Sequence, residues 1–121
     1  MGDYRELVAW QRARALVEAV YRATECFPVR ERYGLAAQMR RAAISVMSNI
    51  AEDGGRNSDR ELRRFLQIAR GSLGELQSQI TVACDLQLIA SGPAQALDQA
   101  AADTGRVVYG LLRVYSTRRL P

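Results

Sequence analysis

The sequence contains no histidine and no lysine, and it has only two cysteines and three prolines in 121 residues. Without histidine it lacks the commonest general base and a frequent zinc ligand. Cys26 and Cys84 form no CxxC pair, and no glycine-rich phosphate loop is followed by Lys and Ser or Thr. We therefore expect no enzymatic activity, no catalytic residues, no metal site and no cofactor.

Long apolar runs are also missing from the sequence. No run approaches the roughly 20 residues that cross a bilayer, and the N-terminus has no basic and apolar signal. We expect a cytoplasmic protein with no membrane partner. In that compartment two separated thiols are more often small core residues than a disulfide, and we interpret both cysteines in this way.

The apolar residues that are present follow a helical pattern. They make up 48% of the chain, and no segment alternates with a period of two. Four stretches with helical spacing are separated by turn signals, at residues 3–27, 35–54, 58–89 and 93–115. The pairs Asp3 with Glu6 and Ser58 with Glu61 are typical of helix N-termini, and Pro93 suits a first helical turn. We predict one all-α domain over residues 1–121, an antiparallel up-down-up-down four-helix bundle.

The second stretch carries a polar stripe. At about 100° per residue, its polar side chains fall within an arc of roughly 100°. We interpret five of them as a structural network that pairs across helices: Gln38, Arg41, Ser45, Asn49 and Glu52. A metal or acid/base role for Glu52 and Asp53 is the less favoured alternative, because adjacent helical side chains point about 100° apart.

The apolar surface of the same stretch is about twice as wide as the arc of roughly 100° that one helix buries in a monomer. A second apolar face must then be buried against another chain, which predicts a homo-oligomer. The residues that we place at this interface are Ala37, Arg40, Ile44, Met47 and Ala51. The alternative is an alanine-rich flank exposed to water.

The third stretch is basic on the side opposite its leucines. All 17 basic residues of the chain are arginine, whose planar guanidinium suits phosphate, and the net charge is +4. Five arginines cluster here: Arg56, Arg60, Arg63, Arg64 and Arg70. They extend over roughly 20 Å, enough to contact several phosphates of RNA or DNA. A solvated face in which Asp59 pairs with Arg63 explains the pattern equally well.

These stretches together resemble a known family, the small four-helix-bundle proteins associated with intervening sequences of bacterial 23S rRNA genes. The motifs that carry the resemblance are Trp10-Gln11, Gln38, Arg40-Arg41, Ser45, Ser48-Asn49-Ile50-Ala51-Glu52 and Ala69-Arg70-Gly71-Ser72. The similarity covers roughly the first three quarters of the chain. Where the family often has Glu-Gly after Asn-Ile-Ala, this chain has Glu52-Asp53-Gly54-Gly55, which implies a shifted turn.

The resemblance implies a homo-oligomeric ring, a pentamer, of antiparallel four-helix bundles. Because the family includes accessory proteins of diversity-generating retroelements, it also implies nucleic-acid binding and a reverse transcriptase as partner. We therefore predict a non-enzymatic oligomeric scaffold that binds nucleic acid through its arginine face. The alternative is a protein-only interaction module whose arginine face is solvated.

Overall fold

Four long helices make up most of the protein. The computed structural model describes residue 5, residues 7–54 and residues 58–118. The helices are α1 (Val8–Thr24), α2 (Leu35–Gly54), α3 (Asp59–Asp85) and α4 (Ser91–Arg118), with a short 3₁₀ helix, η2 (Val29–Glu31), between the first two. The described residues include no β-strand. The predicted all-α class and the number of long helices are confirmed.

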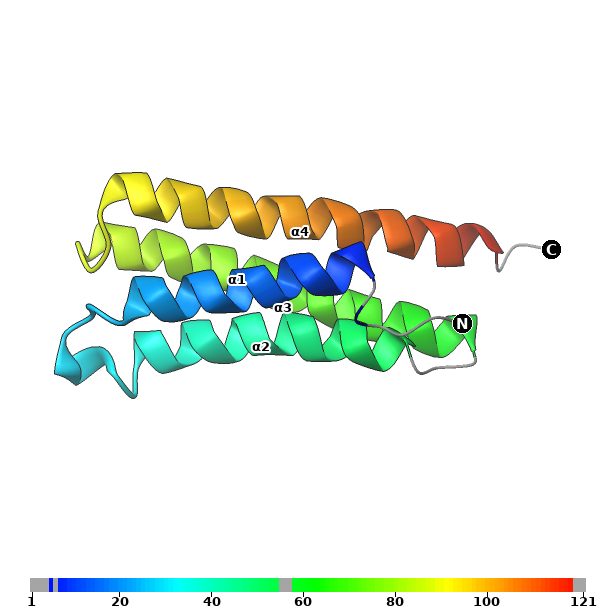
Figure 1. The fold of residues 1–121 in the computed structure, drawn as a ribbon, viewed down its shortest axis with the longest axis horizontal. Helices are drawn as coiled ribbons and strands as arrows, with labels where there is room; N and C mark the ends of the chain where they lie inside the picture. The colour runs from blue at the N-terminus through cyan, green and yellow to red at the C-terminus, as the bar shows by residue number, and fades with distance from the viewer. Residues whose placement is uncertain (1–4, 6, 55–57, 119–121) are drawn as a thin grey trace.

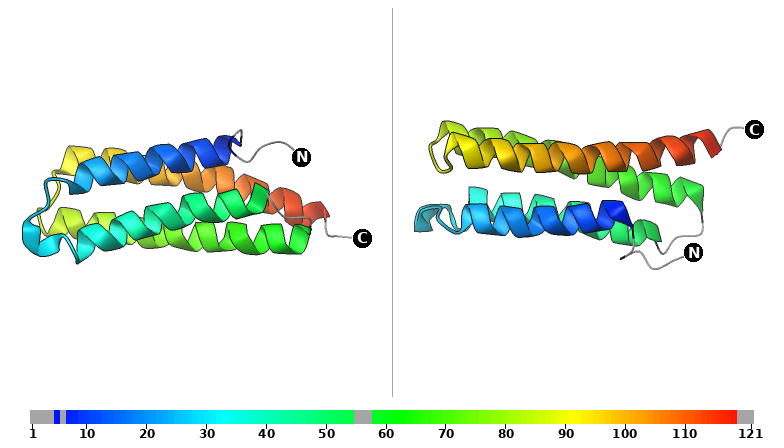
Figure 2. Two further views of the ribbon diagram at one scale, coloured as in Figure 1. Left: turned by 60° about the horizontal axis from the view of Figure 1, so that its bottom comes forward. Right: turned by 45° about the horizontal axis from the view of Figure 1, so that its top comes forward.

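The helices pack side by side in the cyclic order α1, α2, α3, α4, and α1 also packs on α4. Followed by colour, the chain reverses direction from each helix to the next (Figure 1), and the two further views show the same course (Figure 2). Contacts between α3 and α4 show the same reversal of direction. Arg70 contacts Tyr109, and farther along α3 Gln77 contacts Asp98, which lies earlier in α4. Each helix therefore has two neighbours and one face turned to solvent.

The core consists of one apolar face from each helix. Buried residues recur at spacings of three and four, as the helical period requires. The larger side chains that are fully buried are Leu16, Val20, Met39, Val46, Ile50, Leu66, Leu76 and Val108. Removing each from water contributes roughly 1.5–3 kcal/mol to folding. Two buried threonines, Thr24 and Thr104, donate their hydroxyl hydrogens to the carbonyls of Val20 and Ala100 one turn earlier.

The start of α3 agrees with the predicted capping pair. Ser58 adopts an extended conformation, and its hydroxyl accepts a hydrogen bond from the backbone N–H of Glu61 at 3.1 Å. The other predicted pair, Asp3 with Glu6, lies outside the described residues, and α1 begins at Val8 after Leu7, without a hydrogen bond from a capping side chain.

Two helices end earlier than predicted. We expected α3 to run toward Ile89, but it ends at Asp85 because Gln87 adopts a left-handed conformation with φ of 60°. The N–H of Leu88 then donates to the carbonyl of Ala83 at 2.9 Å, as in a Schellman motif. The first helix was expected to reach residue 27, but it ends at Thr24, whose carbonyl accepts from the N–H of Phe27 in a turn.

In the part of the chain that the structure describes, no helix combines the length and apolar character of a membrane span. Within the same residues, no three or more Cys, Asp or Glu side chains form a group that could hold a metal ion. Both cysteines are free. The interpretation of Cys26 as a core residue was wrong, because it lies exposed in the turn after α1, whereas Cys84 is half-buried.

Candidate nucleic-acid interface

The outer face of α3 carries the predicted arginine stripe. Arg60, Arg64 and Arg70 are exposed, and Arg63 is half-buried. The leucines and alanines on the opposite side of the helix are buried in the core. The fifth predicted residue, Arg56, lies outside the described residues.

The basic surface continues onto α4, which the sequence analysis did not predict. Arg106, Tyr109 and Arg113 line the same groove between α3 and α4 as Arg70 does. This groove has a volume of about 640 Å³. The guanidinium of Arg70 lies over the ring of Tyr109, with its Cζ atom 5.1 Å from the ring centroid. An arginine of α3 is thus joined to an aromatic ring of α4 across the groove.

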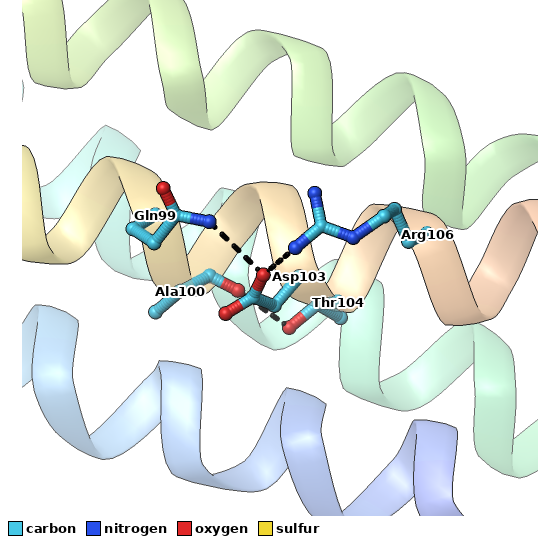
Figure 3. Close-up of polar contacts among 5 residues, drawn as sticks. All are labelled: Gln99, Ala100, Asp103, Thr104 and Arg106. Carbon is cyan, nitrogen blue, oxygen red and sulfur yellow. Dashed lines mark hydrogen bonds and ion pairs between the residues drawn. The ribbon is translucent and has the colours of Figure 1, made fainter.

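Asp103 holds one of these arginines. Its Oδ1 atom accepts hydrogen bonds from Nη2 of Arg106 and, at 3.0 Å, from Nε2 of Gln99 (Figure 3). In that view the carboxylate lies between the two side chains on the surface of α4. Asp103 therefore restrains Arg106 and compensates part of its charge. Farther along the same pair of helices, the Nε2 atom of Gln77 on α3 is 3.5 Å from Oδ1 of Asp98 on α4, a weak contact.

Glycines leave parts of this groove open. A Cβ atom added at Gly74 or Gly110 would meet nothing within 4 Å, and one at Gly105 would touch only Leu73, at 3.9 Å. Glycine inside a helix costs about 1 kcal/mol relative to alanine. The packing of the single chain therefore does not require glycine at Gly74 or Gly110.

The polar stripe of α2 lies on the other side of α3. Asn49 donates through Nδ2 to the carbonyl of Ser45 at 2.8 Å and to its Oγ atom at 3.2 Å. The Ser45 hydroxyl is 2.8 Å from that of Ser72 and shares a hydrogen bond with it, so the network crosses from α2 to α3. Sequence reasoning placed Ser72 in a family motif but did not identify it as the partner of Ser45.

The other members of the stripe lie toward solvent. Gln38 and Arg41 are exposed and line a polar groove of about 480 Å³ together with Glu75 and Gln79. Glu52 is exposed near the end of α2. In this groove the Oε1 atom of Gln79 is buried, and it has no hydrogen-bond partner among the described residues. The hydrogen bond that carries the stripe from α2 to α3 thus joins Ser45 and Ser72, and Gln38 and Arg41 lie at the exposed rim.

The apolar flank of α2 is only partly covered within one chain. Ala37, Met47 and Ala51 are half-buried, and Ile44 keeps 37% of its surface exposed. The flank is therefore open enough to meet another molecule.

Arg40, which we placed on this flank, is also bonded within the chain. Its Nε atom donates to Oγ1 of Thr24 at 2.8 Å, and its Nη2 atom is 3.4 Å from the carbonyl oxygen of Tyr21. The guanidinium carbon lies 4.4 Å from the centroid of the Tyr21 ring. Arg40 thus braces α2 against the last turn of α1.

Comparison with known proteins adds one match. The model of a family described as 23S rRNA-intervening sequence protein matches residues 5–110, which include α1, α2, α3 and most of α4. The resemblance found in the sequence is confirmed, and the match extends further along the chain than expected. A comparison with curated proteins finds no significant match.

Proposed function

Because the chain belongs to the family of 23S rRNA-intervening sequence proteins, we propose that it is a non-enzymatic, oligomeric scaffold that binds RNA or DNA through the basic face of α3 and α4. The observation that carries this proposal is the array of arginines along two neighbouring helices. Arg60, Arg64 and Arg70 are exposed on α3, and Arg106 and Arg113 line the adjoining groove. Guanidinium groups bind phosphate with paired N–H donors, and a row of them follows a nucleic-acid backbone without reading its sequence.

Charge on the opposite side of the molecule provides a matched comparison. Arg12, Arg14 and Arg22 are exposed on α1, which packs on α2 and α4 and lies across the bundle from α3. Replacing three arginines of α1 or three of α3 by alanine changes the net charge equally. A difference between the two triple variants therefore reports the position of the arginines and not the total charge.

The proposal is tested by fluorescence anisotropy with labelled RNA and DNA of arbitrary sequence over a range of salt concentrations. Affinity should fall steeply as salt rises, because binding releases counterions from the phosphates. The variant with Arg60, Arg64 and Arg70 changed to alanine should bind less tightly, with a salt slope smaller by about one for each phosphate that is no longer neutralised. The α1 variant should bind like the unaltered protein. Absence of binding at low salt, or equal losses in the two variants, would contradict the proposal and favour a protein-only interaction module.

We propose further that the copies assemble through the flank of α2 formed by Ala37, Ile44, Met47 and Ala51, beside Arg40, which is bonded within the chain. The resemblance described from the sequence implies a ring, a pentamer, and the incomplete burial of this flank within one chain supports its location. A ring would bring several basic faces into one particle and raise the effective concentration of phosphate sites. We propose the cytoplasm as its location and a reverse transcriptase as one protein partner.

A further inference from the structure

Tyr109 is an unusual residue for the middle of a basic groove. It lies on α4 where this helix faces α3, yet 48% of its surface is exposed. Arg70 from the facing helix lies over its ring. An aromatic ring and a guanidinium plane are the two protein groups on which nucleic-acid bases stack most readily. The groove thus offers a stacking surface as well as charge.

Arginines lie on both sides of this ring along α4. Arg106 precedes Tyr109 by one helical turn, and Arg113 follows it by one turn. At 1.5 Å per residue, the two arginines are about 10 Å apart along the helix axis. That distance corresponds to about three stacked nucleotides at 3.4 Å each. A base on the ring would therefore have phosphates near both guanidinium groups, and the exposed Arg106 would exchange its contact with Asp103 for one of them.

The open positions at Gly74 and Gly110 supply the room that such a strand needs. Both glycines line the groove, and neither is held to glycine by packing within the chain. A methyl group at Gly74 would project into space that the structure leaves empty. The groove is therefore open where the backbone of a bound strand would approach α3.

Resting on the proposed function, we propose that the groove between α3 and α4 binds single-stranded nucleic acid, with an unpaired base stacked on Tyr109 and the neighbouring phosphates on Arg70, Arg106 and Arg113. A duplex cannot bind in this way, because its bases are stacked on one another and present only their edges. A strand with unpaired bases presents their faces, and this contact requires no particular sequence.

The test compares two labelled single strands of equal length, one with bases and one abasic at every internal position. The strand with bases should bind about fivefold more tightly or better, the smallest effect expected of one stacked base. Tyr109→Leu should remove this difference, and Tyr109→Phe should retain it. Tyr33→Leu is the control, because Tyr33 is 87% exposed in the connection between α1 and α2.

Two alanine variants of α3 locate the strand. Gly74→Ala adds a methyl group to the groove, whereas Gly71→Ala adds one on an exposed part of the same helix that does not line it. Both should fold with undiminished helix content by circular dichroism. Only Gly74→Ala should weaken binding of the strand with bases. Equal affinities of the two variants would place the strand elsewhere.

The outcomes separate this inference from the function on which it rests. Equal binding of the two strands, or an unchanged base preference in Tyr109→Leu, would overturn base stacking and leave phosphate binding by the basic face intact. Failure of both strands to bind at low salt would overturn the proposed function itself, and the inference with it.

Discussion

Replacing Arg40 tests whether the contact between α1 and α2 stabilises the single chain. Arg40→Met keeps most of the aliphatic stem but removes the guanidinium, and with it the 2.8 Å hydrogen bond to Thr24 and the cation–π contact with Tyr21. Arg41→Met is the matched control, because Arg41 is exposed on the same helix.

The expected loss follows from these two contacts. A hydrogen bond to a charged group contributes about 1.5–3 kcal/mol, and an exposed cation–π contact about 0.5–1 kcal/mol. The 3.4 Å approach of Arg40 to the Tyr21 carbonyl is too long to add much. Since Arg40 is half-buried, we take the lower limit of each range and expect the free energy of unfolding to fall by about 2 kcal/mol. At an unfolding entropy of about 2.1 cal/mol/K per residue, this lowers Tm by roughly 8 °C.

The assay is thermal unfolding followed by circular dichroism at two protein concentrations that differ about twentyfold. A contact within one chain lowers Tm equally at both, whereas a contact between copies has a larger effect in the concentrated sample, where more of the protein is assembled. A double-mutant cycle with Thr24→Val should show a coupling of about 1 kcal/mol. The reasoning is refuted if Arg40→Met loses no more stability than Arg41→Met, or loses it only in the concentrated sample.

Two further predictions concern assembly and helix capping. Ile44→Asp should disperse the oligomer while leaving most helix content, since it places a charge on the flank assigned to the neighbouring copy. Light scattering would measure the particle mass and circular dichroism the helix content. An unchanged particle mass would remove Ile44 from the interface. Ser58→Ala should lower the free energy of unfolding by about 1 kcal/mol in denaturant titrations, because it removes the acceptor for the N–H of Glu61. Ser48→Ala, at an exposed position within α2, should change it much less, and equal losses would contradict the capping role.

The helices could be predicted from the sequence because their apolar residues keep one period over many turns and because turns separate them. The end of α3 could not, since Gln87 adopts a conformation that is usual for glycine and has no marker in the sequence. Ser58 was correctly identified because its capping interaction is local.

The candidate site was only half predictable for a related reason. A helical wheel groups residues of one helix, so it found the arginines of α3. Arg106, Tyr109 and Arg113 share a face of α4 by their spacing, but only the packed structure places that face beside Arg70. The wheel likewise put Arg40 on the open flank of α2, although its long side chain reaches across to Thr24.

The helices differ in length, and this has a consequence for the basic groove. α3 has 27 residues and α4 has 28, whereas α1 has only 17, so the longer pair extends past the start of α1 (Figure 1). Beyond that level, α3 is the only other long helix among the described residues that lies beside the last turns of α4. The last turns of α4 therefore have one neighbouring helix fewer than its middle, so separating them from α3 should cost less than separating the middle of the pair, and this end is where the groove can widen for a bulkier occupant.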